Sequence, residues 1–393
     1  MAKRLMVVVG TRPDTIKLAP LIGKLRAAPD LEPIVVSTGQ HREMLDQALD
    51  LFSIRPHHDL NVMKHGQSLS GVTCRVLQGI KPVIQREKPD AVIVQGDTTT
   101  AFSGALAAFY EQVPVVHLEA GLRTGNPLSP YPEEMNRRLI TQLSALHLTP
   151  TSSNRDNLLT EGVEQSSVVT IGNTGIDALF EAAAARKGYE RPELRFLDGD
   201  NRRVLLVTTH RRESWGAPMV NIGRAVATIA RGDPGLLIVI PLHLNPVVRQ
   251  ALAPAVRGLP NVFVTEPASY MDLVRLMILS SLIQTDSGGV QEEGPSLGKP
   301  VLVLRDTTER PEAVIFGTTR LLGTGRARIV DGVRSLLYDA AAYAEMANAT
   351  NPYGDGQAAN RAVAAIRCFF RLGPPAVEFD PVHPTSPGWM PAA

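Results

Sequence analysis

Short apolar runs recur along the chain and alternate with longer stretches of mixed polarity. In the first half these runs cover residues 5–9, 33–37, 91–95, 113–118 and 168–171. Runs that are apolar throughout are typical of parallel strands covered on both faces. The intervening stretches are long enough to be helices that link parallel strands, and they cover residues 14–26, 42–51, 71–86 and 98–110. The first half therefore predicts a βα series.

The same alternation starts again in the second half. Strands are predicted over residues 203–208, 236–241, 261–265, 282–284 and 300–304. Helices are predicted over residues 220–231, 246–256, 271–280 and 290–297. Two successive βα series predict an α/β protein of two Rossmann-like, parallel-sheet domains that face a central cleft.

The domain limits follow from this restart. We expect an N-terminal domain over residues 1–174 and a C-terminal domain over residues 175–356, which opens with an Ala-rich helix at 177–186. A last helical pattern covers residues 357–371. Residues 373–393 contain six prolines, and this composition predicts a disordered tail.

Composition narrows the class of protein. The chain has 393 residues, too many for one core, and 44% of them are hydrophobic. Lys and Arg number 40 and Asp and Glu 39, so the net charge of 40 − 39 = +1 favours neither nucleic acid nor an anionic membrane. The two cysteines do not form a disulfide framework or a zinc-site pattern, and no apolar stretch approaches the roughly 20 residues of a membrane span. We expect a cytoplasmic protein without a metal.

The first candidate site is the segment GTRPDTIK, which begins at Gly10 where the first strand passes into a helix. Glycine allows a close backbone approach, and the helix start and the cations Arg12 and Lys17 would attract a phosphate. The segment matches neither a P-loop nor a GxGxxG fingerprint. A plain strand–helix turn with solvated charges is an equally good interpretation.

Three carboxylates follow later strands of the first half. Asp97 in QGDTTT, taken alone, is more readily a helix cap than a catalytic group. Glu119 in HLEAGLRT ends an apolar strand, where desolvation raises a carboxyl pKa toward values useful for proton transfer. Glu133 in YPEEMNRR could simply pair with Arg137 along a helix. Together, however, the three carboxylates suggest acid–base catalysis.

The second half carries anion-binding candidates. His210 stands beside two arginines in HRRES, and one of these could clamp phosphate oxygens. The turn of Ser287, Gly288 and Gly289 opens a helix whose N–H groups can hold a diphosphate, with Glu293 placed to accept from ribose hydroxyls. Arg310 in RDTTERPE either joins this anion site or belongs to a salt-bridged loop.

With these motifs assembled, residues 5–371 resemble the non-hydrolysing UDP-N-acetylglucosamine 2-epimerases, which have the GT-B fold. The resemblance rests on motifs in register: GTRPDTIKLAPL, GQHREMLDQ, QGDTTTAFSGALAAFY, HLEAGLRTGN, SPYPEEMNRR, HRRES, LHLNP, TDSGGVQEEGPSLGKPVLVLRDTTERPEA and NPYGDGQA. It implies interconversion of UDP-GlcNAc and UDP-ManNAc without a cofactor, through elimination of UDP to 2-acetamidoglucal and its re-addition. It also implies that the last helix packs back on the first domain and that the protein is a homodimer.

The resemblance also implies roles for the candidates. Asp97, Glu119 and Glu133 would serve proton transfer and stabilise the cationic sugar, and His210 would assist the departing diphosphate. The nucleotide would be held by Arg12, Lys17, Leu273, Ser287, Gly288, Gly289 and Arg310, with Glu293 on its ribose. An activating second UDP-GlcNAc would meet Gln40, His41, Glu43, Gly66, Glu134 and His243.

Several positions depart from the family pattern. Asp14 replaces a Glu, Gln95 replaces a His, and Thr209 replaces a small residue. Leu273 and Ala268 stand near the expected uracil position, where many members carry an aromatic or aliphatic residue and a Gln. In the expected activator site Glu43 replaces Gln and Gly66 replaces Arg, so a cation is lost and a negative charge is added. We therefore expect weak or absent activation.

Other functions fit the same resemblance. A hydrolysing relative would release ManNAc and UDP, and a GT-B glycosyltransferase would use the same donor. The three carboxylates argue against simple transfer, which needs no base at C2. A UDP-sugar-binding protein without catalysis is a third alternative, which the intact carboxylates and His210 disfavour.

Overall fold

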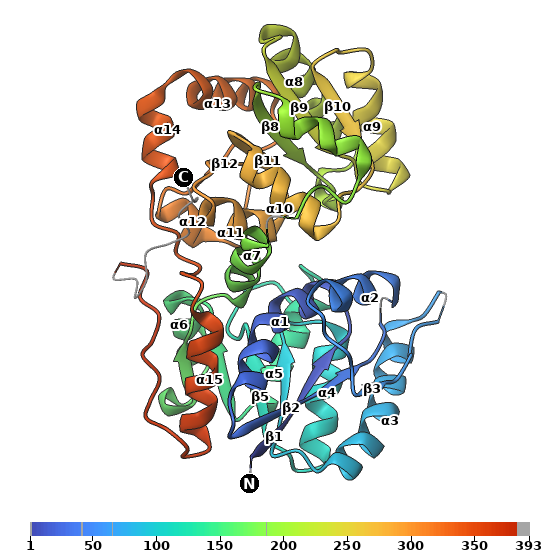
Figure 1. The fold of residues 1–393 in the computed structure, drawn as a ribbon, viewed down its shortest axis with the longest axis vertical. Helices are drawn as coiled ribbons and strands as arrows, with labels where there is room; N and C mark the ends of the chain where they lie inside the picture. The colour runs from blue at the N-terminus through green and yellow to red at the C-terminus, as the bar shows by residue number, and fades with distance from the viewer. Residues whose placement is uncertain (1, 41, 65, 186, 383–393) are drawn as a thin grey trace. The chain divides into compact units, whose positions relative to one another are not determined.

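The computed structural model describes residues 2–40, 42–64, 66–185 and 187–382. These form two compact units (Figure 1). Unit 1 contains the chain up to Ala178 and resumes at Tyr353, whereas unit 2 is Leu179–Pro352. The first boundary lies four residues after the predicted one at 174, and the second lies four residues before the predicted one at 356.

Unit 1 is built on a seven-stranded sheet in the order β3-β2-β1-β4-β5-β6-β7, and every pairing is parallel. Its strands are β1 (Lys3–Val9), β2 (Leu31–Ser37), β3 (His58–Asp59), β4 (Ala91–Gln95), β5 (Val115–Leu118), β6 (Leu146–Thr149) and β7 (Val168–Thr170). The order reverses between β1 and β4, which makes the carboxyl ends of these strands the expected ligand position.

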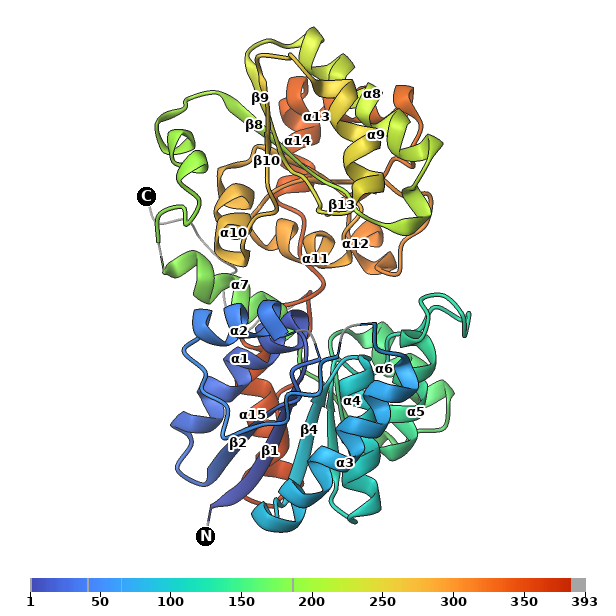
Figure 2. The ribbon, with the colours of Figure 1, turned by 90° about the vertical axis from the view of Figure 1, so that its right-hand side faces the viewer.

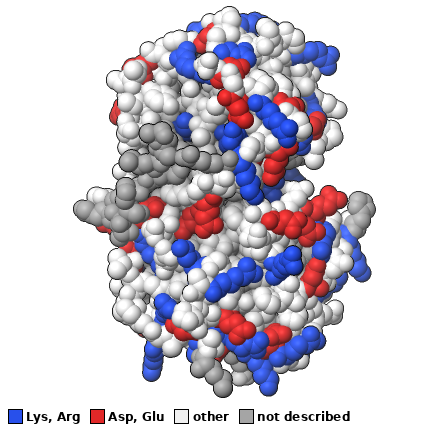
Figure 3. Space-filling model, in the orientation of Figure 1, with Lys and Arg blue, Asp and Glu red and all other residues white. Residues whose placement is uncertain are grey.

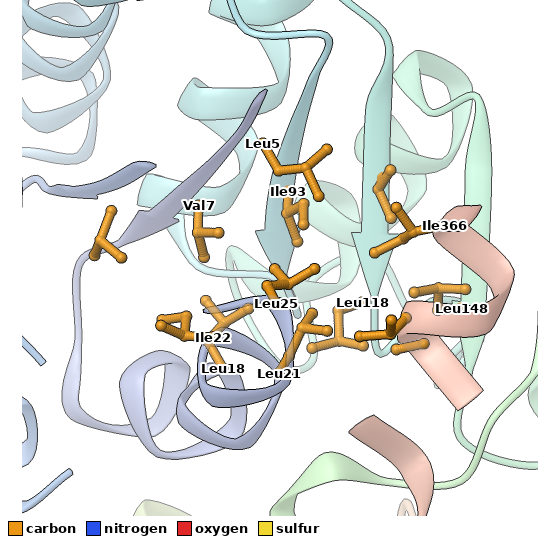
Figure 4. Packing of buried hydrophobic residues seen from close by; sticks show 14 of the residues in the cluster. Leu5, Val7, Leu18, Leu21, Ile22, Leu25, Ile93, Leu118, Leu148 and Ile366 are labelled. Atoms are coloured by element: carbon orange, nitrogen blue, oxygen red, sulfur yellow. The ribbon is translucent and has the colours of Figure 1, made fainter. Parts of the chain in front are cut away.

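Helices cover both faces of this sheet because its buried strands are apolar on both sides. Leu5 and Val7 of β1 pack toward α1 (Arg12–Ala27) and α15 (Ala358–Phe369), as Figure 4 shows. Met6 and Val8 face the opposite way, toward α3 (Leu69–Glu87) and α4 (Thr99–Tyr110), which lie side by side in Figure 2. The remaining helices that begin in unit 1 are α2 (Arg42–Leu51), α5 (Glu133–Leu143), α6 (Ser152–Thr160) and α7 (Thr174–Ala184), with a short 3₁₀ turn at Gln165–Ser167.

The returning chain is fixed to unit 1 by polar contacts. The Asp177 carboxylate accepts from the backbone N–H groups of Ala358 and Ala359 and so caps α15. Further along, the N–H of Phe379 donates to the Thr170 carbonyl of β7 at 2.8 Å, and its ring is buried. The disorder predicted for residues 373–382 from their proline content is therefore not what the structure shows. The rest of that predicted tail lies outside the described residues.

Unit 2 contains a six-stranded sheet in the order β10-β9-β8-β11-β12-β13, again parallel throughout. Its strands are β8 (Arg203–Thr208), β9 (Leu236–Pro241), β10 (Val262–Thr265), β11 (Leu282–Thr285), β12 (Val301–Val303) and β13 (Thr319–Leu321). Its helices are α8 (Ala217–Gly232), α9 (Pro246–Val256), α10 (Tyr270–Leu279), α11 (Gly288–Ser296), α12 (Pro311–Ile315), α13 (Arg326–Tyr338) and α14 (Ala340–Ala347), with 3₁₀ turns at Pro192–Gly199 and Arg212–Ser214. A core of α8, α9 and α13 side chains packs against β8.

The predicted elements omit several helices and strands of the structure. The omitted helices are α6, α12, α13 and α14. The sequence analysis missed β3, β6 and β13, which have two to four residues each. The strand predicted at 113–118 begins instead at Val115. Pro114 precedes it and has no N–H group to donate to a neighbouring strand.

Charges of both signs are interspersed on the surface shown in Figure 3. No helix in the described part of the chain is long and apolar enough to cross a membrane. Within the same residues, no group of three or more His, Cys, Asp or Glu side chains could hold a metal ion.

Candidate active site

The predicted carboxylates of unit 1 follow the carboxyl ends of neighbouring strands. Asp97 follows β4, Glu119 follows β5, and Glu133 is the first residue of α5. The turn that follows β1 at the same end of the sheet has no room for a side chain. A Cβ atom at Gly10, directly after β1, would lie 2.2 Å from Thr100 Oγ1, so no larger residue fits there.

Asp97 is the centre of this group. Its side chain is 22% exposed, its carboxylate is paired with Arg137, and its carbonyl accepts from Asn136 Nδ2 at 2.8 Å. Burial raises the pKa of Asp97, Arg137 opposes this effect, and Glu119 and Glu133 raise the pKa further by repulsion. The structure thus brings Glu119 and Glu133 close enough to Asp97 to affect its pKa.

Glu119 adopts a left-handed backbone conformation, with φ at +63°. Such a conformation costs about 1–3 kcal/mol for a residue other than glycine and is found most often at functional sites. It directs the carboxylate toward Lys17 Nζ, which pairs with Oε1, and toward Gln95 Nε2, which donates to Oε2. Gln95, one of the departures from the family pattern, therefore contacts a candidate catalytic group directly.

Asp14 lies beside this group at the start of α1. It forms a capping box with Thr11, and its Oδ2 also accepts from Thr98 Oγ1 at 3.3 Å. Burial, with a smaller contribution from Asp97, raises the pKa of Asp14 to about 7. Arg12, the first residue of α1, lies at the same sheet edge.

A buried imidazole supports the turn that carries Asp97. His117 of β5 is fully buried, and its Nε2 lies 2.7 Å from the Gly96 carbonyl, so this nitrogen carries the proton and donates. Burial lowers the pKa of His117 to about 3. On the adjacent strand, burial lowers the pKa of His147 to about 4. Both rings are therefore neutral at physiological pH.

The residues expected to bind a second nucleotide sugar lie on different elements and belong to both units. Gln40 Oε1 accepts from the N–H and Oγ1 of Thr100 near the start of α4, at 3.1 and 2.7 Å. Glu43 is exposed on α2, whereas Glu134 is fully buried and accepts from the Thr124 N–H at 3.0 Å and from Arg138 Nε at 3.1 Å. His41 lies outside the described residues, and His243 belongs to unit 2.

In unit 2, a buried aspartate organises the loop of His210. Asp286, which follows β11, accepts from the backbone N–H groups of His210 and Arg211, each at 2.9 Å, and from Thr209 Oγ1 at 2.6 Å. The His210 ring is stacked on His243, with centroids 5.5 Å apart. Burial lowers the pKa of His210, and the nearby Asp286 charge opposes this effect.

The glycine-rich turn lies next to this loop, because β8 and β11 are neighbours in the sheet. Ser287 is the N-cap residue of α11, and its side chain makes no capping bond, so the first N–H groups of the helix are not occupied by it. A Cβ atom at Gly289 would meet nothing within 4 Å. The start of α11 can therefore receive an anion.

Three further predicted residues belong to unit 2, two of them on helices and one directly before a helix. Glu293 of α11 accepts a hydrogen bond from the hydroxyl of the buried Tyr270, at 3.2 Å. Leu273 is half-buried on α10, one turn along from Tyr270. Arg310, which precedes α12, donates through Nε to Glu292 at 2.8 Å.

Sequence reasoning missed two residues that act on the candidates. Arg137 was interpreted as a helical partner of Glu133, but its guanidinium pairs with Asp97 and approaches Glu134 at 3.4 Å. Asp286 stands in the conspicuous segment TDSGG, yet its bonds reach a loop more than seventy residues away in sequence. Only its position after a strand adjacent to β8 could have suggested this contact.

Two doubly wound parallel sheets, one edged with carboxylates and one with a glycine-rich turn and arginines, define an α/β protein of the GT-B class. A family model described as UDP-N-acetylglucosamine 2-epimerase matches residues 23–367. The Escherichia coli K12 UDP-N-acetylglucosamine 2-epimerase is 50% identical over 370 residues, covering 93% of this chain and 98% of that protein.

Solved structures agree with this match. The Neisseria meningitidis UDP-GlcNAc 2-epimerase bound to UDP-GlcNAc is 45% identical, with a TM-score of 0.85 over 92% of this chain and 99% of that one. The UDP complex of S. aureus MnaA is 43% identical, with a TM-score of 0.86 over 96% and 100%. The chain belongs to the UDP-N-acetylglucosamine 2-epimerase family, which confirms the resemblance found in its motifs.

Proposed function

We propose that this protein interconverts UDP-GlcNAc and UDP-ManNAc reversibly, by anti elimination of UDP and its re-addition to 2-acetamidoglucal. The observation that carries the proposal is the group of Asp97, Glu119 and Glu133, in which burial and mutual repulsion raise the pKa of Asp97. A carboxyl group with a raised pKa holds its proton more readily, and it is therefore better suited to act as a general acid or base. The family's ligand-bound relatives support the choice of substrate.

The chemistry explains why carboxylates and an anion site are both needed. The C2 proton of the sugar has no neighbouring carbonyl, so a base cannot remove it easily. If the C1–O bond to UDP breaks first, the C1 cation acidifies C2–H, and a carboxylate takes that proton to leave the glycal. A carboxyl group then returns a proton to the opposite face of C2, and the C1–O bond to UDP forms again to give the epimer.

The two units would divide this work. In unit 1, Asp97, Glu119 and Glu133 would transfer protons and stabilise the cationic sugar, with Arg12 and Lys17 as cations near the diphosphate. In unit 2, Ser287, Gly288, Gly289 and Arg310 would hold the diphosphate, His210 would assist its departure, and Glu293 and Leu273 would contact the nucleoside. The proposed elimination and re-addition need no redox cofactor, since neither step transfers a hydride.

Incubation with UDP-GlcNAc in D₂O tests the proposal. Reversible epimerisation places deuterium at C2 of both nucleotide sugars. Free ManNAc together with UDP would instead establish the hydrolysing reaction, and bound UDP-GlcNAc without isotope exchange or turnover would identify a binding protein. Transfer to an acceptor without C2 exchange would identify a glycosyltransferase.

Activation by a second nucleotide sugar should be weak or absent. Gly66 supplies no cation to a diphosphate, and the exposed Glu43 would repel it. Initial rates in the UDP-ManNAc direction should therefore change less than about twofold when traces of UDP-GlcNAc are added. Strict dependence of the rate on that addition would contradict this expectation.

We further propose a cytoplasmic homodimer. Large apolar side chains are exposed on two helices of unit 1, with Phe109 and Tyr110 on α4 and Met135 and Leu139 on α5. Such exposure is typical of subunit interfaces. Both cysteines are free, and disulfides are rare in proteins of a reducing compartment. Sedimentation at micromolar concentration tests the dimer, and a monomer would contradict it.

A further inference from the structure

A carboxylate of the protein lies at the start of α11, where the glycine-rich turn is suited to receive phosphate. Glu309 follows β12, and its Oε1 would lie 3.2 Å from a Cβ atom built on Gly288, the first residue of α11. The unpaired N–H groups and the dipole of a helix start attract negative charge. The glycine-rich turn therefore already has an anion beside it.

Three arginines hold this carboxylate. Arg211 Nη2 donates to Oε1 of Glu309 at 3.0 Å, and Arg305 Nη1 donates to Oε2 at 2.5 Å. Arg310 Nη1 lies 3.6 Å from Oε1. The Glu309 side chain is 16% exposed, so these ion pairs are poorly screened by water. Two of the three arginines, Arg211 and Arg310, come from the motifs predicted to bind diphosphate.

Glu309 is ionised at neutral pH. Burial by itself raises the pKa of Glu309, but Arg310, Arg211 and Arg305 together lower it to about 2. A permanent negative charge therefore neutralises part of the cationic surface. A nucleoside diphosphate that approaches Gly288 and Gly289 would be repelled by Glu309 and attracted by the arginines.

The surroundings leave room for such competition. A Cβ atom built on Gly289 would point into open space, whereas one built on Gly288 would lie close to Glu309, Arg211 and Arg310. Arg211 also has a buried Nε without a hydrogen-bond partner among the described residues. A rearranged Arg211 could thus donate to a phosphate oxygen while Glu309 keeps Arg305 as its partner.

We propose that Glu309 is an internal anion that competes with the diphosphate for Arg211 and Arg310, and so limits the affinity of unit 2 for nucleoside diphosphates. This inference rests on the proposed function, because it assumes that unit 2 binds UDP. Weaker binding of the nucleotide favours its release, which often limits turnover.

Calorimetric titration of Glu309→Gln with UDP, UMP and uridine tests the competition. Loss of one negative charge beside the diphosphate should lower the Kd of UDP roughly fivefold to tenfold. The Kd of UMP should fall less, and that of uridine should not change, because uridine carries no phosphate. Glu266→Gln is the matched control, since Glu266 forms an exposed ion pair with Arg249 in the same unit. It should leave all three affinities within about twofold.

The outcomes separate this inference from the proposed function. Unchanged or weaker UDP binding by Glu309→Gln overturns the competition, and weaker binding of uridine as well identifies Glu309 as a structural support. Wild-type protein that does not bind UDP overturns the proposed function itself. If thermal denaturation shows that Glu309→Gln does not fold, Glu309→Asp withdraws the carboxylate from Gly288 and should also tighten UDP binding. If the Kd of UDP does not fall in that variant, the proposal is likewise overturned.

Discussion

The two units share one architecture and use charge in opposite ways. Each has a parallel sheet with a reversal of strand order at its centre. In each, candidate residues follow the strands at that reversal and the strand next to them. In unit 1 the carboxyl groups of Asp14 and Asp97 lie together, and burial raises the pKa of both. In unit 2 arginines surround Glu309, and the pKa of Glu309 is lowered to about 2.

The difference shows how similar sheets can serve different chemistry. A raised pKa lets a carboxyl group hold a proton more readily, which favours a role in general acid–base catalysis. A carboxylate with a lowered pKa stays charged, and it can only orient or neutralise cations. Substitutions that affect proton transfer in unit 1 should therefore leave nucleotide binding in unit 2 unchanged. Substitutions that weaken nucleotide binding in unit 2 should leave proton transfer unchanged.

The largest effect is expected from Asp97→Asn. Asparagine cannot exchange a proton, so deuterium incorporation at C2 in D₂O should fall roughly 10²- to 10⁴-fold. The Kd of UDP should change less than about twofold, since the proposed role of Asp97 is at the sugar and not at the nucleotide. Calorimetry and NMR of the nucleotide sugars measure the two quantities. Asp156→Asn, an exposed carboxylate of α6, is the control and should retain exchange.

A smaller effect, on nucleotide binding and not on proton exchange, is expected from Arg310→Lys. Lysine keeps the charge but loses the planar fork that matches phosphate oxygens, so the Kd of UDP should rise roughly tenfold. With saturating substrate, C2 exchange per turnover should persist. Arg249→Lys, in an exposed ion pair of the same unit, should leave the Kd unchanged. Loss of exchange at saturation with normal UDP binding would contradict the division between the units.

The smallest effect concerns the stability of the sheet edge in unit 1. His117 has a folded-state pKa of about 3, well below the unfolded value of 6.5, so the unfolded chain takes up a proton first as the pH falls. The free energy of unfolding should therefore decrease from pH 6.5 toward pH 3, by up to about 1.4 kcal/mol per pH unit from this group.

His117→Gln keeps an N–H donor for the Gly96 carbonyl and removes the titration. Its free energy of unfolding, measured by urea denaturation between pH 6.5 and 5, should depend less steeply on pH than that of the wild type. Equal slopes in the two proteins would show that His117 is protonated, or accessible to water, in the folded state.

Much of the fold could be predicted because buried parallel strands are apolar throughout and long helices separate them. The missed strands are short, and β6 (Leu146–Thr149) contains a buried histidine that interrupts its apolar pattern. The sequence analysis missed the ordered segment around Phe379 because its proline content predicts disorder. Its order depends on a hydrogen bond to the carbonyl of Thr170, which lies on an edge strand distant in sequence.

The sequence by itself determined the α/β class, the family and the candidate residues, because motifs and periodicity are local properties of a chain. The tertiary structure decided which charges meet. Arg137 pairs with Asp97 rather than Glu133, Asp286 holds the loop of His210, and Glu309 lies against Gly288. Burial and the distance between charges fix whether a carboxyl group holds a proton, and both arise only when separate strands come together.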